Sequence, residues 1–184
     1  PDWSMGVTNT VRYKGFTLSS LIDMRFGGDL YSGTNSGAYS RGLHKETLVG
    51  RGEGIVGEGV ALSTCTGETA DGVPTGCSAN TVRLDEQDYY ADLTGFAEPF
   101  VYDASYVKLR ELKLSYRLPS RWFAGTPIQV ATFSLVGRNL WLIHSSVPNV
   151  DPESQYSVSN GTQGLEWLGV PQTRSLGFNF NIRL

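Results

Sequence analysis

Apolar and polar residues alternate with a period of two along most of this chain, outside two long stretches. Such alternation predicts β-strands that present one apolar and one polar face. Five strands are predicted, at residues of about 4–13, 16–26, 106–118, 128–142 and 173–184. In the last of them, the apolar face consists of Leu176, Phe178, Phe180, Ile182 and Leu184.

The third predicted strand changes phase along its length. Its lower half alternates regularly, with Leu112, Leu114 and Tyr116 on the apolar side. In its upper half, Val107 and Leu109 fall on the otherwise polar side. We therefore expect the packing of the upper half to differ from that of the lower half.

The connections between the predicted strands alternate strictly between short and long. Lys14-Gly15 and the segment 119–127 are short, whereas 27–105 and 143–172 are long loops. A transmembrane β-barrel has this pattern, because its periplasmic turns are short and its extracellular loops are long. Five strands cannot close such a barrel, since the smallest have eight. We therefore expect an all-β fold: five antiparallel strands from the C-terminal part of a larger barrel, in a chain cut from a longer one.

Composition and charge agree with this interpretation. The chain has 184 residues, of which 40% are hydrophobic, 18% charged and 11% aromatic. Its longest apolar run is Leu140-Trp141-Leu142-Ile143, which excludes a transmembrane helix. The net charge of −3 gives no electrostatic footprint for nucleic acid. The segment 27–105 carries 12 acidic and 4 basic residues, so it has a charge of −8 while the remainder has +5.

Several motifs resemble, in the same order, those of one protein family. The most specific is the segment 104–119, Ala-Ser-Tyr-Val-Lys-Leu-Arg-Glu-Leu-Lys-Leu-Ser-Tyr-Arg-Leu-Pro. The others are Asn9-x-x-x-Tyr13-Lys14-Gly15-Phe16-x-Leu18, Asp23-x-x-x-Gly27-Gly28, Gly137-Arg138-Asn139-Leu140, Asp151-Pro152-Glu153 and Pro171-x-x-Arg174-Ser175-x-Gly177-Phe178-Asn179. Together they resemble the C-terminal part of the SusC/RagA family of TonB-linked outer-membrane proteins.

The resemblance implies a function and partners. Proteins of this family form 22-stranded barrels in the outer membrane of Gram-negative bacteria, with an N-terminal plug that these residues do not include. A SusD-like surface lipoprotein covers the barrel, and the TonB complex drives import of glycans or oligopeptides. No cofactor is implied. An alternative is a structural or adhesive outer-membrane barrel that does not transport, and a third possibility is a soluble β-sandwich binding module.

The C-terminal strand also resembles a barrel-assembly signal. Ser175, Gly177, Phe180 and Ile182 form a polar-x-Gly-x-x-apolar-x-apolar run at the end of the chain. In such signals the apolar side chains present one face while the backbone stays open for pairing. A plain amphipathic strand would show the same alternation.

Cys65 and Cys77 are the only cysteines. Two thiols at this spacing without a nearby His make a poor zinc site, so a disulfide across a glycine-rich loop is favoured over a metal or redox pair. The acidic residues around Asp85 and Asp92 could bind a cation, but a solvated acidic loop is favoured and no metal site is predicted. His44 and His144 lie in no catalytic pattern, and we do not expect an enzyme.

Aromatic residues are the candidate ligand contacts. Trp141, Tyr156 and Trp167 lie in or beside the second long loop, and Tyr39 lies in the first. Aromatic rings can stack on sugars or peptide groups, but they also pack within loops or gather at membrane interfaces. Trp3, Tyr13, Tyr116 and Trp122 are expected near the short turns, as a periplasmic aromatic girdle.

Overall fold

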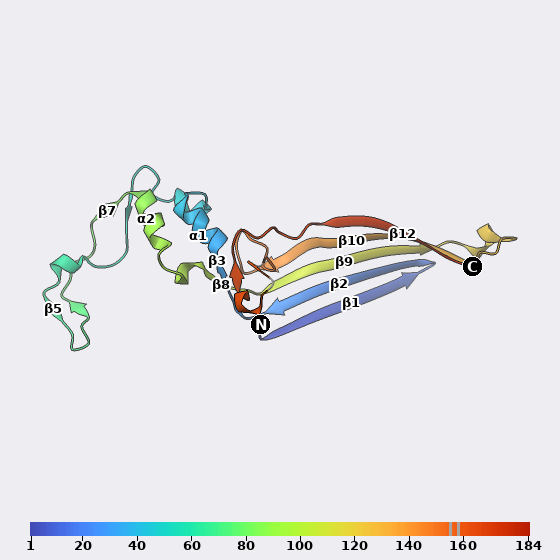
Figure 1. Cartoon of the computed structure of the whole chain (residues 1–184), viewed down its shortest axis with the longest axis horizontal. Coiled ribbons are helices and arrows are strands. Elements are labelled where there is room, and N and C mark those ends of the chain that lie inside the picture. Colours follow the sequence, from blue (N-terminus) through green and yellow to red (C-terminus); the bar gives the residue numbers. More distant parts are fainter. Residues whose placement is uncertain (155, 158) are drawn as a thin grey trace. The chain divides into compact units, whose positions relative to one another are not determined.

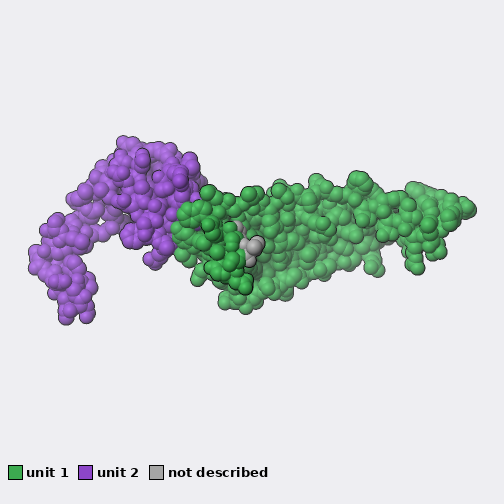
Figure 2. All heavy atoms as spheres, in the orientation of Figure 1, with its two compact units in different colours: residues 1–32, 101–184 green, residues 33–100 purple. Residues whose placement is uncertain are grey.

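The computed structural model describes residues 1–154, 156–157 and 159–184. Gln155 and Val158, which belong to the second predicted loop, lie outside the described residues. The chain divides into two compact units, coloured separately in Figure 2. Unit 1 comprises residues 1–32 and 101–184, and unit 2 comprises residues 33–100. Each is described by itself.

Unit 1 is built on an antiparallel five-stranded sheet in the order β1-β2-β9-β10-β12 (Figure 1). Its strands are β1 (Trp3–Tyr13), β2 (Phe16–Phe26), β9 (Tyr106–Arg117), β10 (Val130–Ser145) and β12 (Ser175–Arg183). The all-β, antiparallel fold class predicted from the alternation is therefore confirmed. The strands lie within a few residues of their predicted positions, and the largest difference is that β10 continues to Ser145.

The register places both long connections at one end of the sheet. Tyr106 pairs with Arg25 on one side and with Ser145 on the other, so β2, β9 and β10 meet the long connections together. The short connections lie at the opposite end, where Tyr13 pairs with Phe16. Lys14 and Gly15 have φ angles of 43° and 90°, the positive values that a tight two-residue hairpin requires. We call the first end the loop end and the second the turn end.

The two faces of the sheet differ in polarity. One apolar row crosses all five strands through paired positions, and each of its residues is at least 42% exposed. The row consists of Val11, Leu18, Leu114, Leu135 and Phe178. A parallel row on the other face is polar and consists of Arg12, Thr17, Ser115, Ser134 and Asn179. So much exposed apolar surface in one patch indicates a face that meets lipid or a partner.

A β-bulge explains the change of phase in the third predicted strand. Leu21 pairs with Glu111, and the next residue, Ile22, pairs with Leu109, so Arg110 is an extra residue in β9. An extra residue shifts the alternation by one position. Val107 and Leu109 thereby stay on the apolar face with Leu112 and Leu114.

A smaller sheet lies at the loop end of unit 1. It has the order β11-β3-β8, formed by β11 (Leu165–Glu166), β3 (Asp29–Ser32) and β8 (Val101–Asp103). Its hydrophobic core consists of Leu30, Ala104 and Val147. The hydroxyl of Ser32 donates a hydrogen bond to Oε2 of Glu166 at 2.7 Å, and both residues are fully buried. The short 3-10 helices of unit 1 are η4 (Ser120–Phe123) and η5 (Asn160–Thr162).

Unit 2 is more ordered than the sequence pattern suggests. The sequence pattern predicts one long loop at 27–105, whereas residues 33–100 of it contain short helices and strands. They are α1 (Gly33–Ser40), η1 (Lys45–Leu48), β4 (Ile55–Val56), η2 (Leu62–Thr64), β5 (Gly67–Glu68), β6 (Pro74–Thr75), β7 (Arg83–Leu84), α2 (Glu86–Leu93) and η3 (Glu98–Phe100). Eight-residue helices span only about two turns, which is too short for a clear helical period in the sequence.

One residue of the expected periplasmic girdle is misplaced. Trp3 pairs with Phe26 at the loop end, and their rings stack with centroids 4.6 Å apart. Tyr116 lies at the turn end, where its ring is 4.4 Å from that of Phe16. The prediction for Trp3 is wrong because this residue begins its strand, whereas the turn follows the end of that strand.

No helix within the described residues is long and apolar enough to cross a membrane.

Candidate functional site

Charged residues from three segments of unit 1 meet at the loop end of the sheet. Lys108 and Arg110 project from β9, Asp23 from β2, and Asp151 and Glu153 from the segment that follows β10. We call these five residues the charged cluster. Lys108 Nζ lies 2.6 Å from Oδ1 of Asp151 and 2.6 Å from Oε2 of Glu153.

Arg110 is the centre of the charged cluster. Its Nη1 and Nη2 donate to Oε2 and Oε1 of Glu153 at 2.9 and 2.7 Å, and Nη2 also pairs with Asp23. Nη1 further donates to the side-chain oxygens of Asn139 and Gln172, at 3.2 and 3.1 Å. The bulge gives Arg110 its own position on the polar face, so its planar guanidinium reaches both the neighbouring strands and the loop.

Asp151 and Glu153 stay ionised although their side chains are largely buried. Burial alone would raise the pKa of Glu153, but hydrogen bonds from Arg110 and Lys108 outweigh it and lower the pKa to about 2. The pKa of Asp151 is lowered for the same reason. Burial alone would raise it, but the hydrogen bond from Lys108 lowers it. Three carboxylates face two cations, so the cluster carries a net charge of −1. Its geometry fastens the 146–174 segment to the polar face of the sheet.

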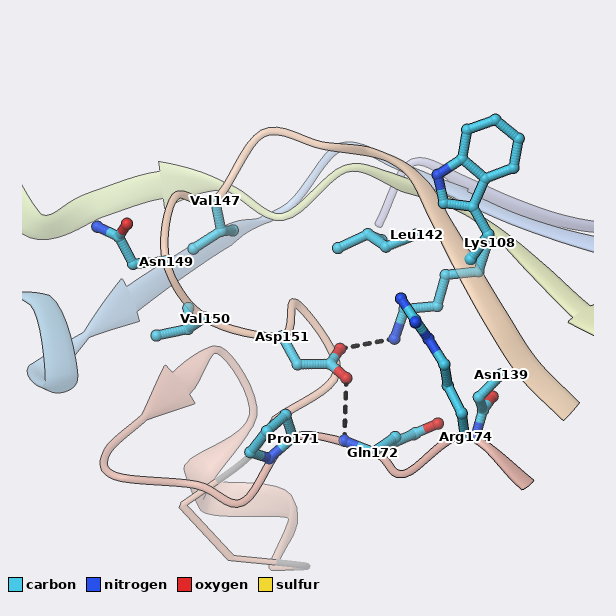
Figure 3. Close-up of a pocket in the computed structure, with 11 residues that line it drawn as sticks. Lys108, Asn139, Leu142, Val147, Asn149, Val150, Asp151, Pro171, Gln172 and Arg174 are labelled. Atoms are coloured by element: carbon cyan, nitrogen blue, oxygen red, sulfur yellow. Dashed lines mark hydrogen bonds and ion pairs between the residues drawn. The ribbon is translucent and has the colours of Figure 1, made fainter. Parts of the chain in front are cut away.

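A cavity of about 400 Å³ lies beside the charged cluster (Figure 3). Leu142, Val150 and Pro171 supply apolar walls, and Lys108, Asp151 and Arg174 supply charge. In Figure 3 the carboxylate of Asp151 lies between the Lys108 ammonium and the backbone N–H of Gln172, which donates to it at 3.2 Å. A concave site that combines apolar walls with a few fixed polar groups has the character of a small-ligand pocket.

The four aromatic residues predicted as ligand contacts lie in different surroundings. Trp141, Tyr156 and Trp167 are 60%, 59% and 49% exposed, and Trp141 borders the cavity. Tyr39 is only 8% exposed and belongs to unit 2, where it stacks on His44 and contacts Tyr90 and Phe100 edge-on. Its ring is therefore part of a packed core in this conformation, and the structure does not bring all four residues together.

The remaining predicted site residues are not members of the charged cluster. Cys65 and Cys77 are joined in a disulfide in unit 2, with Cα atoms 3.9 Å apart. Ser175, Gly177, Phe180 and Ile182 all belong to β12, which forms one edge of the five-stranded sheet. Phe180 and Ile182 pair with Phe133 and Ala131 of β10. The described residues contain no group of three or more His, Cys, Asp or Glu side chains placed to hold a metal ion.

Sequence reasoning did not identify the charged cluster as a site. Its members lie up to 130 positions apart and form no spacing motif of their own. A signal was nevertheless present, because all five residues fall within the short motifs that resemble the SusC/RagA family. Asn139 belongs to another of those motifs, and Gln172 lies inside the last one.

A known receptor resembles this chain over its whole length. No family model matches the chain. TonB-dependent receptor P3 of Formosa agariphila is 28% identical over 188 residues, a match that covers 100% of this chain. The chain is similar to this TonB-dependent receptor over its whole length. It spans only 16% of the length of that receptor.

Solved structures show the same fold. The structure of the RagAB peptide transporter matches with a TM-score of 0.59 and 18% identity, over 96% of this chain and 16% of that one. The RagAB peptide importer in its closed-closed state matches with a TM-score of 0.58 and 18% identity, over 97% and 17% of the two chains. The Formosa agariphila protein is named a receptor, and the two solved structures are named a peptide transporter and a peptide importer. They are not enzymes, in agreement with the expectation from the sequence.

Proposed function

We propose that this chain is the C-terminal part of an outer-membrane, TonB-dependent importer of oligopeptides or glycans. The five-stranded sheet supplies the last strands of a 22-stranded transmembrane barrel. Its apolar face meets lipid and its polar face lines the lumen. The long connections 27–105 and 143–172 are extracellular, and the short ones are periplasmic.

The charged cluster is the observation that carries this proposal. A purely structural barrel needs no ion pairs between a loop and the lumen-facing side of its wall. Here Lys108 and Arg110 fasten the segment with Asp151 and Glu153 against the polar face. The fastened segment forms a wall of the 400 Å³ cavity. We propose that this cavity captures a ligand at the extracellular mouth.

The partners follow from this function. We propose that a SusD-like lipoprotein lies over the loop end and that the TonB complex acts through a plug outside these residues. Trp141, Tyr156 and Trp167 are proposed ligand contacts, because their exposed rings lie on β10 or in the connection that follows it. Ser175, Gly177, Phe180 and Ile182 are proposed to present β12 to the barrel-assembly machinery.

Uptake in cells tests this function. The gene for the whole receptor is deleted, and uptake of fluorescent oligopeptide and oligosaccharide pools is compared between the deletion and the complemented strain. We expect uptake of at least one pool to require the receptor, TonB and the proton gradient, and a lipoprotein to co-purify with the receptor. Equal uptake by both strains, with normal cell adhesion lost in the deletion, would instead support the structural or adhesive alternative.

A further inference from the structure

A second cavity in unit 1 shares no lining residue with the cavity beside Trp141, and two of its lining residues carry polar atoms without partners among the described residues. Its volume is about 380 Å³. Its lining includes Arg25, Asp29, Pro152, Ser154, Gln163 and Leu165. No aromatic residue belongs to the lining, and the volume is far larger than the ~30 Å³ share of one water molecule.

Two buried side-chain atoms in this lining have no hydrogen-bond partner among the described residues: Nε of Arg25 and Oγ of Ser154. Ser154 is only 6% exposed. A buried donor without a partner destabilises the folded state, so such groups in a folded protein call for an explanation. Both side chains belong to the lining of this one cavity, so rotation of each side chain can turn its donor toward a ligand there.

Arg25 also lacks an ion pair within the described part of the chain. This sets it apart from Lys108 and Arg110 on the same face, whose charges are matched within the charged cluster. The register places Arg25 opposite Tyr106, whose hydroxyl donates to Glu153 at 3.1 Å. Glu153 and Asp23 are thus paired within the charged cluster, and no ion pair joins Arg25 to a carboxylate of the described residues.

The charged cluster also fixes Ser154. The backbone N–H of Ser154 donates to the carbonyl of Asp151 at 2.8 Å, and the preceding residue, Glu153, is paired with Arg110. The backbone of Ser154 is therefore held in place before a ligand arrives. A preorganised backbone of this kind loses little conformational freedom on binding.

We propose that this cavity is a subsite for a carboxylate group of the imported ligand, bound by Arg25 and Ser154. A guanidinium and a hydroxyl are donors suited to a carboxylate. Asp29 in the same wall accepts from N–H or O–H groups next to that carboxylate and disfavours a second anion. Without an aromatic ring, the subsite does not stack a neutral sugar. This inference rests on the proposed import function and specifies which chemical group the ligand must carry.

Binding to the whole receptor in detergent tests the subsite. The probes are N-acetyl-trialanine with a free carboxylate, the same peptide as its C-terminal amide, trigalacturonic acid and neutral trigalactose. We expect at least one free acid to bind about tenfold more tightly than its uncharged counterpart, measured by calorimetry. Preference for the peptide acid identifies a peptide carboxylate, and preference for trigalacturonic acid identifies a sugar acid.

Variants assign the preference to these residues. Arg25→Gln should remove the difference between acid and amide, and Ser154→Ala should reduce it about threefold. Arg12→Gln is the matched control, because Arg12 lies on the same polar face near the turn end and is absent from the cavity lining. Equal binding of every acid and its counterpart, failure of all four probes to bind, or a preference that survives Arg25→Gln would each overturn the subsite.

Uptake in cells separates this inference from the import function. Receptor-dependent uptake without any carboxylate preference would overturn the subsite and leave the importer intact. A carboxylate preference that depends on Arg25, in a receptor that supports no uptake, would overturn the proposed import function. The proposed subsite would still stand.

Discussion

Arg110 and Glu153 form a two-point ion pair, in which both guanidinium Nη atoms meet both carboxylate oxygens at 2.9 and 2.7 Å. Two parallel hydrogen bonds fix orientation as well as distance. The pair joins β9 to a segment 43 residues later, so it determines how the connection after β10 folds onto the sheet.

Glu153→Gln should destabilise the receptor by about 3 kcal/mol, because it leaves Lys108 and Arg110 under-compensated in a largely buried site. The measurement is the urea midpoint of the receptor in lipid vesicles. Glu111→Gln is the control, since Glu111 pairs with Arg138 on the exposed surface and such pairs contribute less than about 1 kcal/mol. Equal effects of the two substitutions would contradict the role given to Glu153.

The charged cluster should weaken only in acid. The pKa of Glu153 in the folded chain, about 2, is below its ordinary value of 4.5. The stabilisation is therefore complete above about pH 5 and is lost as the pH falls toward 2. Urea midpoints at pH 7, 5.5 and 3.5 check this. The difference between the wild type and Glu153→Gln should be constant at the two higher values and shrink at pH 3.5. A difference that grows in acid would refute it.

The bulge at Arg110 predicts which residues of β9 face lipid. Single cysteines at Val107, Leu109 and Leu112 should all be accessible to a lipid-soluble spin-relaxing agent, and one at Lys113 to a water-soluble agent. Electron paramagnetic resonance of spin-labelled receptor measures this accessibility. Without the bulge, Val107 and Leu109 would share the face of Lys113 and show its accessibility instead.

Reduction of the Cys65–Cys77 disulfide should loosen unit 2 alone. The bridge closes a loop with a sequence separation of 12, for which the chain-entropy model gives roughly 3 kcal/mol. Limited proteolysis with and without dithiothreitol should show new cleavage near residues 60–80, with the five-stranded sheet protected. The double variant Cys65→Ser, Cys77→Ser should be cleaved there regardless of reductant. Unchanged cleavage after reduction would count against this role.

Substitution of two predicted ligand contacts should have different effects, on ligand binding in one case and on stability in the other. Trp167→Ala should weaken ligand binding about three- to tenfold through lost ring contacts and leave stability unchanged. Tyr39→Ala should destabilise unit 2 by about 3 kcal/mol, because it removes a buried ring. Binding calorimetry and thermal unfolding distinguish the two effects, and Trp122→Ala, an exposed ring in η4, is the control for Trp167. Unaltered binding by Trp167→Ala would remove it from the site.

The sequence was most informative about the strands. A period of two is a local property of consecutive residues, and it places Leu112, Leu114 and Tyr116 on one face without knowledge of any partner. The positive φ angles at Lys14 and Gly15 likewise follow from a local turn requirement. Unit 2 was less predictable, because α1 and α2 are too short to show a period. In α2 a local cap contributes, since Asp85 accepts a hydrogen bond from the N–H of Gln87.

The sequence by itself thus determined the antiparallel strands, their two faces, the alternation of short and long connections, and the resemblance to a receptor family. Only the tertiary structure decided that Asp23, Lys108, Arg110, Asp151 and Glu153 meet, and that Arg25 forms no ion pair with any other described residue. The physical reason is one of range. Side-chain alternation is set within a few residues, whereas the pairing of charges depends on strand register, on the bulge at Arg110 and on the path of a connection that returns to the sheet.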